Sequence, residues 1–286
     1  MWRGNRLQKV FRLARTFVTD PIMVGRALPG EIRQWSQWRR RGKFAGLTAN
    51  DEWDEHLHKL LGAPWPCAKD HRFDDVIRDI GALLEAREWG FGRDTYGWYA
   101  DADRSFCRAL WCVARHTRPE VIIETGVAHG VTSRVVLEAL RRNDFGHLWS
   151  IDLPFPFDHR LHGETGIIVT DALRTRWSYL AGSSRQRLPG LVTDVGHVEM
   201  FIHDSLHTAE NTIFEMEQAA SAMRGGSVML IDDIDSHMGF AVFARRHPGW
   251  KSIICPSVDR NGMFGIAVKT PTPQTFPVGD SSVAQS

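Results

Sequence analysis

The chain has 286 residues, enough for one α/β domain of ordinary size together with an extension. Hydrophobic residues make up 43% of it and charged residues 24%, and the formal net charge of +1 gives no reason to expect a nucleic-acid partner. The longest apolar runs are strand-sized, far below the ~20 residues that span a bilayer. The N-terminus lacks the uninterrupted apolar segment of a secretory signal, so we expect a cytoplasmic protein.

Four cysteines occur, and none belongs to a Cys-x-x-Cys pair: Cys67, Cys107, Cys112 and Cys255. This spacing argues against a zinc site and favours reduced thiols in a cytosolic compartment. Cys107 and Cys112 precede the first predicted strand on a helix, where we expect them to be small core residues.

Residues 1–103 form a lead segment that is basic at first and then rich in tryptophan. From Met1 to Lys43 there are eleven Lys or Arg and two acidic residues, a net charge of +9 that leaves −8 for the rest of the chain. Apolar residues recur in it at helical spacing, at Leu7, Val10, Phe11, Ala14 and Val18. Such a helix could lie on an acidic membrane, pack on a partner subunit of a homo-oligomer, or fold onto its own domain with its basic face in water.

Three aromatic residues near the end of this segment, Trp89, Trp98 and Tyr99, could form a lid over an acceptor, since aromatic faces pack well on sugars and rings. Burial in the core is the alternative for most of the eleven tryptophans.

Residues 104–269 alternate short apolar strands with helices. The predicted strands are 121–123, 148–151, 178–181, 200–203, 228–231, 251–255 and 263–268, and the clearest helices are 132–140 and 209–223. Strands alternating with helices indicate a parallel sheet, so we expect an α/β, Rossmann-like, doubly wound sheet of seven strands after a mainly helical extension. Asn261-Gly262 is a hairpin signal, which makes the last two strands an antiparallel pair. The residues from 270, rich in Pro, Ser, Thr and Gln, are expected to be a disordered tail.

The segment from Glu124 to Ser133 joins the first predicted strand to the following helix. Ligands of open α/β sheets bind beyond the carboxyl ends of the strands, and glycines such as Gly126 and Gly130 let the backbone turn sharply there. Asp152 ends the next strand, 22 residues after Gly130, where a carboxylate can reach the two hydroxyls of a bound ribose. The loop and the acid together indicate a nucleoside-type pocket, whereas the loop by itself could be a turn that only packs helix against strand.

The loop favours S-adenosylmethionine over a dinucleotide. A dinucleotide fingerprint requires Gly-x-Gly-x-x-Gly, but Ala128 stands at the second glycine position and the spacing fails. Glu124 would repel a pyrophosphate, whereas the methyl donor has no phosphate and carries a positive sulfonium and a positive ammonium.

Two more strand ends carry carboxylates, Asp204 in His203-Asp204-Ser205-Leu206-His207 and the pair Asp232-Asp233. If the strands are neighbours, the three carboxylates converge and would repel one another unless a cation, most plausibly Mg²⁺, lay between them. His207 would then lie beside the metal, where an imidazole can remove a proton from an acceptor hydroxyl. The alternatives are that Asp232 or Asp233 caps a helix, that His207 only begins one, and that His203 is structural.

These motifs resemble a known group of enzymes. The Glu-Thr-Gly-x-Ala-His-Gly loop is similar to that of the cephalosporin-hydroxylase-like and rhamnosyl O-methyltransferases. His-Asp-Ser-Leu-His together with Leu-Ile-Asp-Asp resembles metal-dependent O-methyltransferases, which include macrolide-sugar enzymes and, more distantly, catechol O-methyltransferase. The similarity covers about Arg104 to Lys269. Val131 stands where the first group often has glycine, which tilts the match towards the broader class I methyltransferase family.

The resemblance implies roles for particular residues. The donor's amino acid end would be lined by the loop, with Glu124, Gly126, Ala128 and Gly130, and Thr132 would stand at the helix start. Asp152 would hold the ribose, and Ser183 falls where relatives have an acid beside the adenine. Metal ligands would be Asp204, Asp232 and Asp233, with His207 as base. The expected reaction is an in-line methyl transfer to a hydroxyl of a small molecule or glycosyl acceptor.

Two other functions stay open at this point. One is an NAD(P)-dependent oxidoreductase on a similar sheet, against which the glycine spacing and Glu124 argue. The other is a non-catalytic assembly protein that keeps the donor pocket.

Overall fold

The computed structural model describes residues 14–39, 47–67, 72–89, 95–97, 102–258 and 262–271. Several predictions fall outside these residues: the start of the basic helix at Leu7, Val10 and Phe11, the aromatic pair Trp98 and Tyr99, the turn at Asn261, and the tail beyond 271.

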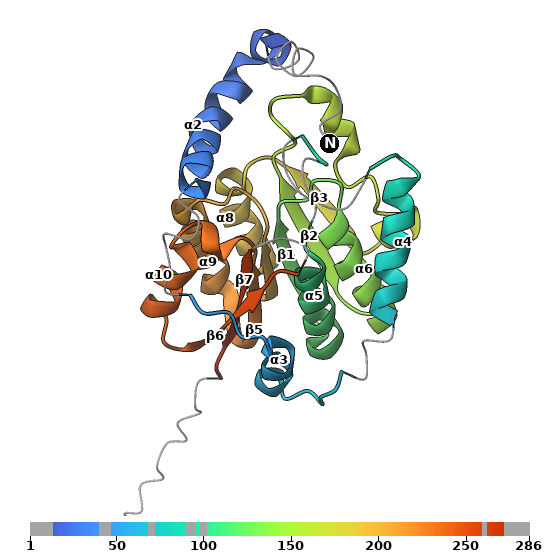
Figure 1. Cartoon of the computed structure of the whole chain (residues 1–286), viewed down its shortest axis with the longest axis vertical. Coiled ribbons are helices and arrows are strands. Elements are labelled where there is room, and N and C mark those ends of the chain that lie inside the picture. The colour runs from blue at the N-terminus through green and yellow to red at the C-terminus, as the bar shows by residue number, and fades with distance from the viewer. Residues whose placement is uncertain are drawn as a thin grey trace, which may run out of the picture.

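A seven-stranded sheet forms the centre of the molecule, as predicted (Figure 1). Its strands are β1 (Val121–Thr125), β2 (His147–Asp152), β3 (Trp177–Ala181), β4 (Val198–His203), β5 (Met223–Ile231), β6 (Trp250–Pro256) and β7 (Met263–Lys269). They lie in the order β3-β2-β1-β4-β5-β7-β6. The first five are parallel, and β7 runs antiparallel to both β5 and β6. The chain order reverses between β1 and β4, which is where open sheets of this kind bind ligands.

Helices cover both faces of the sheet because side chains alternate between the two sides of each strand. On β1, Ile122 belongs to the apolar cluster on the side of α5 (Arg104–Thr117) and α6 (Val131–Asn143), whereas Ile123 belongs to the cluster on the other side. That second layer contains α8 (Ser184–Val195), α9 (Ala209–Ala222) and α10 (Gly239–Arg246). Short helices, η2 (His159–Glu164), α7 (Asp171–Arg174) and η3 (Ile234–Ser236), complete the connections.

The two helices α3 (Trp53–Leu61) and α4 (Phe73–Glu85) pack into the same core as the sheet. Leu57 and Ile80 are fully buried in the cluster that also holds Ile122. Apolar residues at helical spacing build this face of α4: Phe73, Val76, Ile77, Ile80 and Leu84. This part of the N-terminal extension therefore shares the core of the predicted domain.

A long helix, α2 (Pro21–Trp38), lies over the carboxyl ends of the strands, beside α8 and α9 in Figure 1. Asp20 caps it by accepting a hydrogen bond from the backbone N–H of Met23, 2.9 Å. The short helix 14–19 and α2 carry exposed apolar side chains, of which the last two line the cavity described below: Phe17, Val18, Ile22, Leu28, Ile32 and Trp35. The membrane or subunit contact expected for the basic N-terminus stays a prediction. None of the described helices is both long and apolar enough to cross a membrane.

Candidate active site

The strand register brings the predicted acidic residues to one edge of the sheet. Thr125 pairs with His203, and His203 pairs with Ile231. The ladder continues one residue further, because the N–H of Asp204 donates to the carbonyl of Thr125 at 2.8 Å and that of Asp232 to the carbonyl of His203 at 2.9 Å. Strands β1, β4 and β5 are therefore neighbours, which was the condition for Asp204, Asp232 and Asp233 to converge.

Close backbone contact explains the first glycine of the loop after β1. Gly126 has φ +88°, and a Cβ there would lie 2.0 Å from the carbonyl oxygen of Asp204. Any larger residue would push the β1 loop away from the β4 loop, so Gly126 sets their spacing. Ala128 also has a positive φ, +48°, and its backbone N–H points to Asp152.

Glu124 supports the loop from behind. Its carboxylate is fully buried and accepts hydrogen bonds at 2.6 Å from the hydroxyls of Thr132, Ser133 and Ser150. Burial raises the pKa of Glu124, while these three donors oppose the rise. The side chain points towards α6, because neighbouring Ile123 faces the opposite layer.

Asp152 lies at the end of β2, where its Oδ2 accepts the N–H of Ala128 at 3.2 Å. Burial, with a smaller repulsion from Glu124, raises the pKa of this carboxyl group to about 7. The residue lines the cavity described below, so its remaining lone pairs are available to hydroxyl donors of a ligand.

Asp204, His207 and Asp232 form a compact cluster whose ligand-type atoms all lie within 4.8 Å of one another. The Nε2 atom of His207 lies 3.7 Å from Oδ1 of Asp204 and 4.0 Å from Oδ2 of Asp233. Asp232 is only 1% exposed. Two carboxylates and one imidazole in this cluster, with Asp233 next to His207, suit a hard divalent cation, since such a cation removes the repulsion between the carboxylates.

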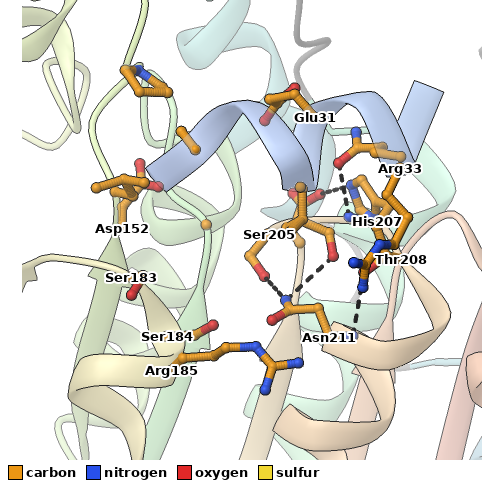
Figure 2. Close-up of a pocket in the computed structure, with 18 of the residues that line it drawn as sticks. Glu31, Arg33, Asp152, Ser183, Ser184, Arg185, Ser205, His207, Thr208 and Asn211 are labelled. Atoms are coloured by element: carbon orange, nitrogen blue, oxygen red, sulfur yellow. Dashed lines mark hydrogen bonds and ion pairs between the residues drawn. The ribbon is translucent and has the colours of Figure 1, made fainter. Parts of the chain in front are cut away.

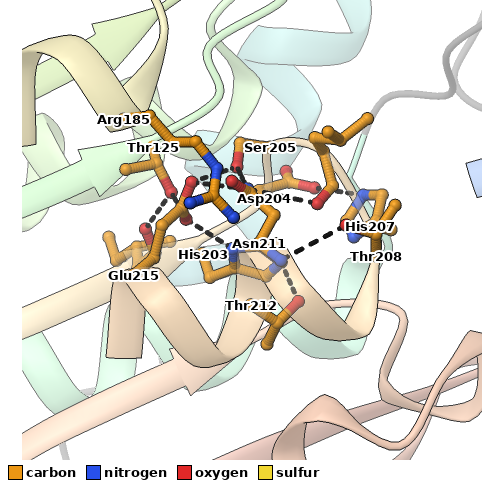
Figure 3. Close-up of polar contacts among 12 residues, drawn as sticks. Thr125, Arg185, His203, Asp204, Ser205, His207, Thr208, Asn211, Thr212 and Glu215 are labelled. Carbon is orange, nitrogen blue, oxygen red and sulfur yellow. Dashed lines mark hydrogen bonds and ion pairs between the residues drawn. The ribbon is translucent and has the colours of Figure 1, made fainter. Parts of the chain in front are cut away.

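A buried network around Glu215 of α9 holds the β4 loop (Figure 3). One carboxylate oxygen contacts Nδ1 of His203 and the hydroxyl of Thr125, both at 2.6 Å. The other accepts the hydroxyl of Ser205 and the amide of Asn211, both at 2.8 Å. Although burial opposes ionisation, the neighbouring His203 and the hydrogen bonds from Ser184 and Thr125 lower the pKa of Glu215 to about 2. His203 thus lies inside this buried network, fully buried and in contact with Glu215 and Thr212.

A cavity of about 970 Å³ lies between these loops and α2. Figure 2 shows α2 passing across it, with Asp152 and Ser183 on one side and His207 and Thr208 on the other. Two glutamines fasten the helix, because Oε1 of Gln34 accepts the N–H of His207 and Oε1 of Gln37 that of Ala209, both at 3.1 Å. An ion pair joins Arg33 to Glu210 of α9. The cavity is thus closed on one side by the N-terminal segment.

The part of the chain that carries most of this site matches a known protein family. Residues 123–234, from β1 to the end of the β5 loop, match a family model described as a methyltransferase domain. The chain contains a methyltransferase domain. No curated protein matches the sequence.

Solved structures share the fold of this methyltransferase at low sequence identity. The O-methyltransferase TomG from Streptomyces achromogenes, solved with S-adenosylmethionine (SAM), has a TM-score of 0.50 and 14% identity over 77% of this chain and 96% of its own. An O-methyltransferase from Bacillus cereus, solved with S-adenosylhomocysteine (SAH), has a TM-score of 0.50 and 13% identity over 77% of this chain and 98% of its own. A putative caffeoyl-CoA O-methyltransferase from Staphylococcus aureus has a TM-score of 0.51 and 11% identity over 76% of this chain and 98% of its own.

The methyltransferase cavity collects most, but not all, of the predicted site residues. Those that line it are Gly126, Ala128, Asp152, Ser183, Asp204, His207 and Asp233. Outside its lining lie Glu124, Gly130, Thr132 and Asp232. Glu124 and Thr132 bond to each other behind the loop, and Asp232 reaches the cluster from below the surface. His207 lies in one cluster with Asp204 and Asp232, and its Nε2 is 4.0 Å from Oδ2 of Asp233, so the roles of Asp204, Asp232 and Asp233 as metal ligands and of His207 as base stay predictions.

Several site residues escaped the sequence analysis. Tyr96, Arg185 and the inner face of α2 line the cavity of the methyltransferase, and Glu215 supports it. Glu215 could have been recognised in the sequence, because it is an acid at helical spacing within the buried face of α9 that Thr212, Met216 and Ala219 form. Trp89, a suggested lid residue, stacks on His129 of the β1 loop, with ring centroids 4.1 Å apart, and its role as a lid stays a prediction.

Proposed function

We propose that this protein is a SAM-dependent O-methyltransferase, assisted by Mg²⁺, that acts on a hydroxyl group of a small molecule or glycosylated acceptor. The observation that carries the proposal is the placement of two different sites in one cavity. A carboxylate suited to ribose hydroxyls, Asp152, lies on one side, and the cluster of Asp204, His207 and Asp232 lies on the other.

The β1 loop and the β2 end would hold the methyl donor. Asp152 would accept hydrogen bonds from the ribose hydroxyls, while the backbone of Gly126 and Ala128 would lie against the amino acid end. Ser183, at the start of α8, lies on the same side and suits the adenine end. Glu124 would keep the loop in shape through its three hydroxyl partners.

The acidic cluster would hold the cation through Asp204 and Asp232, with Asp233 as the third carboxylate and His207 outside the ligand set. When bound, the metal would supply Lewis-acid stabilisation of a developing alkoxide or phenoxide. His207 would accept the hydroxyl proton, and its position at the mouth of the cluster gives it access to an acceptor in the cavity. Glu215 would act as a positioning residue, because it fixes the backbone that carries Asp204 and Ser205.

Two alternative functions differ from this proposal in what they require. An NAD(P)-dependent oxidoreductase would need a loop that approaches a pyrophosphate, and the methyltransferase-domain match over residues 123–234 favours the methyl donor. A non-catalytic assembly protein would bind the donor without turnover, so an activity assay separates it from the enzyme.

The proposed test measures SAH formation with a panel of catechols, phenols and glycosides as acceptors. In Asp204→Ala we expect turnover to fall by more than about 100-fold, while SAH affinity changes by less than about threefold, since the cluster serves the reacting oxygen rather than the donor.

His207→Ala should lose about 100-fold in kcat, and a loss below about tenfold would argue against a role of His207 as the base. Asp171→Ala, a fully exposed acid on α7, is the control. Undiminished turnover of Asp204→Ala in metal-free buffer would rule out the metal.

A further inference from the structure

A second cluster of metal-ligand side chains lies away from the cavity, between α3 and α5. Ligand-type atoms of His58, Cys67 and Cys112 all lie within 4.8 Å of one another. His116 lies beside this group rather than within it: its Nε2 is 3.3 Å from the sulfur of Cys67, but only His58, Cys67 and Cys112 have ligand atoms that all lie within 4.8 Å of one another. Figure 1 shows α3 at the end of the molecule opposite α2, next to α5, so this cluster is distinct from the acidic one.

His58 presents an unused ring nitrogen to the cluster. Its Nδ1 lies 2.6 Å from the carbonyl oxygen of Asp54, which can only accept, so Nδ1 carries the proton. Nε2 is then a lone-pair atom, and it is buried without a hydrogen-bond partner among the described residues. The side chain is 0% exposed. Metal-binding histidines are oriented in this way, with the distal N–H on a backbone carbonyl.

The spacing of the sulfur atoms matches a tetrahedral zinc site. Zn–S bonds of about 2.3 Å at tetrahedral angles place two thiolates about 3.8 Å apart, and Zn–N bonds of about 2.0–2.1 Å place a thiolate and an imidazole about 3.6 Å apart. The sulfur atoms of Cys67 and Cys112 are 3.8 Å apart, and Cys67 is 3.3 Å from His116. None of the four cysteines of the chain is in a disulfide bond.

The local structure explains how these residues meet without a Cys-x-x-Cys motif. Cys112 and His116 lie four residues apart on α5 and therefore share one face of that helix. His58 comes from α3, and Cys67 from the segment that follows it. Arg115 interacts electrostatically with Cys67, and its positive charge favours the thiolate.

We propose that His58, Cys67 and Cys112 bind a structural Zn²⁺ ion and that His116, beside Cys67, turns in as the fourth ligand. Two thiolates and two neutral imidazoles complete a closed tetrahedral shell, which leaves no position for a substrate. Binding would release the two thiol protons to solvent, so affinity would rise with pH. The ion would tie α3 and the residues after it to α5, and with them the N-terminal segment to the methyltransferase domain. The proposal stands independently of the proposed methyl transfer.

The first experiment measures zinc by mass spectrometry in the untagged full-length protein, purified under reducing conditions from zinc-supplemented cells. We expect about one zinc per chain in the wild type and less than a tenth of that in Cys67→Ser and His58→Gln. His56→Gln is the matched control, because His56 is exposed on the same helix two residues away. It should keep its full zinc.

Cobalt provides a second readout that does not depend on the stability of the variants. Co²⁺ added to the reduced, metal-free wild type should give thiolate charge-transfer bands and the intense visible bands of a tetrahedral ion, and Zn²⁺ should displace them. A wild-type protein without zinc and without these bands would overturn the proposal. Recovery of Cys67 and Cys112 as a disulfide in metal-free peptide maps of protein isolated without reductant would overturn it as well.

Discussion

Asp152 is the residue whose ionisation should control donor binding. Burial raises its pKa to about 7, yet ribose hydroxyls bind best to the charged carboxylate. The group therefore binds as an anion above pH 7 and becomes protonated as the pH falls through 7. We expect the Kd for SAH to be about tenfold higher at pH 6 than at pH 8, as measured by calorimetry.

Asp152→Asn is the variant that isolates this effect. It should bind SAH about tenfold more weakly at pH 8, because the charge-assisted hydrogen bonds are lost, and its Kd should be independent of pH between 6 and 8. A variant that keeps the wild-type pH dependence would show that another group controls it.

Glu215 should matter for stability rather than for contact with substrate. Its pKa is about 2 in the folded state, below the 4.5 that is usual for a glutamate, so its ionised form stabilises the fold. This stabilisation is complete above pH 4.5 and is lost as the pH falls towards 2. Glu215→Gln should lower the free energy of unfolding by about 3 kcal/mol at pH 7 in urea titrations, and by much less at pH 3. An equal loss at both pH values would contradict the role of the charge.

At the level of elements, the sequence predicted the strands better than the helices. Six of the seven strands begin and end within two residues of their predicted bounds. The exception is β5, which begins at Met223, five residues before its predicted start. Strand cores such as Val228–Ile231 are short apolar runs, which are readable in sequence, as are the acids that follow them. Helix α8 was missed because Pro189 and Gly190 interrupt its pattern, although Ser183 before it is a helix-start residue.

The arrangement of α2 over the cavity could not be predicted in the same way. Its contacts, Gln34 with His207 and Gln37 with Ala209, join residues more than 170 positions apart through backbone groups. Such contacts leave no periodic trace in the sequence. The cluster of Cys67, Cys112 and His58 was missed for a related reason, because it forms only when α3 packs beside α5.

The double variant Gln34→Ala/Gln37→Ala tests the attachment of α2. Each hydrogen bond contributes about 1 kcal/mol, so the amides of His207 and Ala209 should lose about fivefold in hydrogen-exchange protection. Ser36→Ala, on the exposed outer side of the same helix, should leave both amides unchanged. Equal protection in the double variant and the wild type would mean that the glutamines do not hold the helix.

At the scale of the whole molecule, the loops at the carboxyl ends of the strands line one side of the cavity, and α2 lines the opposite side. The methyltransferase domain supplies Asp152 and the acidic cluster, while the N-terminal segment supplies the opposite wall of the cavity, where we propose that the acceptor binds. Acceptor selectivity should therefore depend on α2, whereas donor binding should depend on the loops after β1 and β2.

Binding of the methyl donor in the cavity can be measured by calorimetric titration of the full-length protein with SAH in the presence of Mg²⁺. We expect a micromolar Kd, which Asp152→Asn weakens about tenfold. Absence of binding heat at several temperatures, in protein shown to be folded, would contradict this expectation and would leave the glycine loop as a purely structural turn.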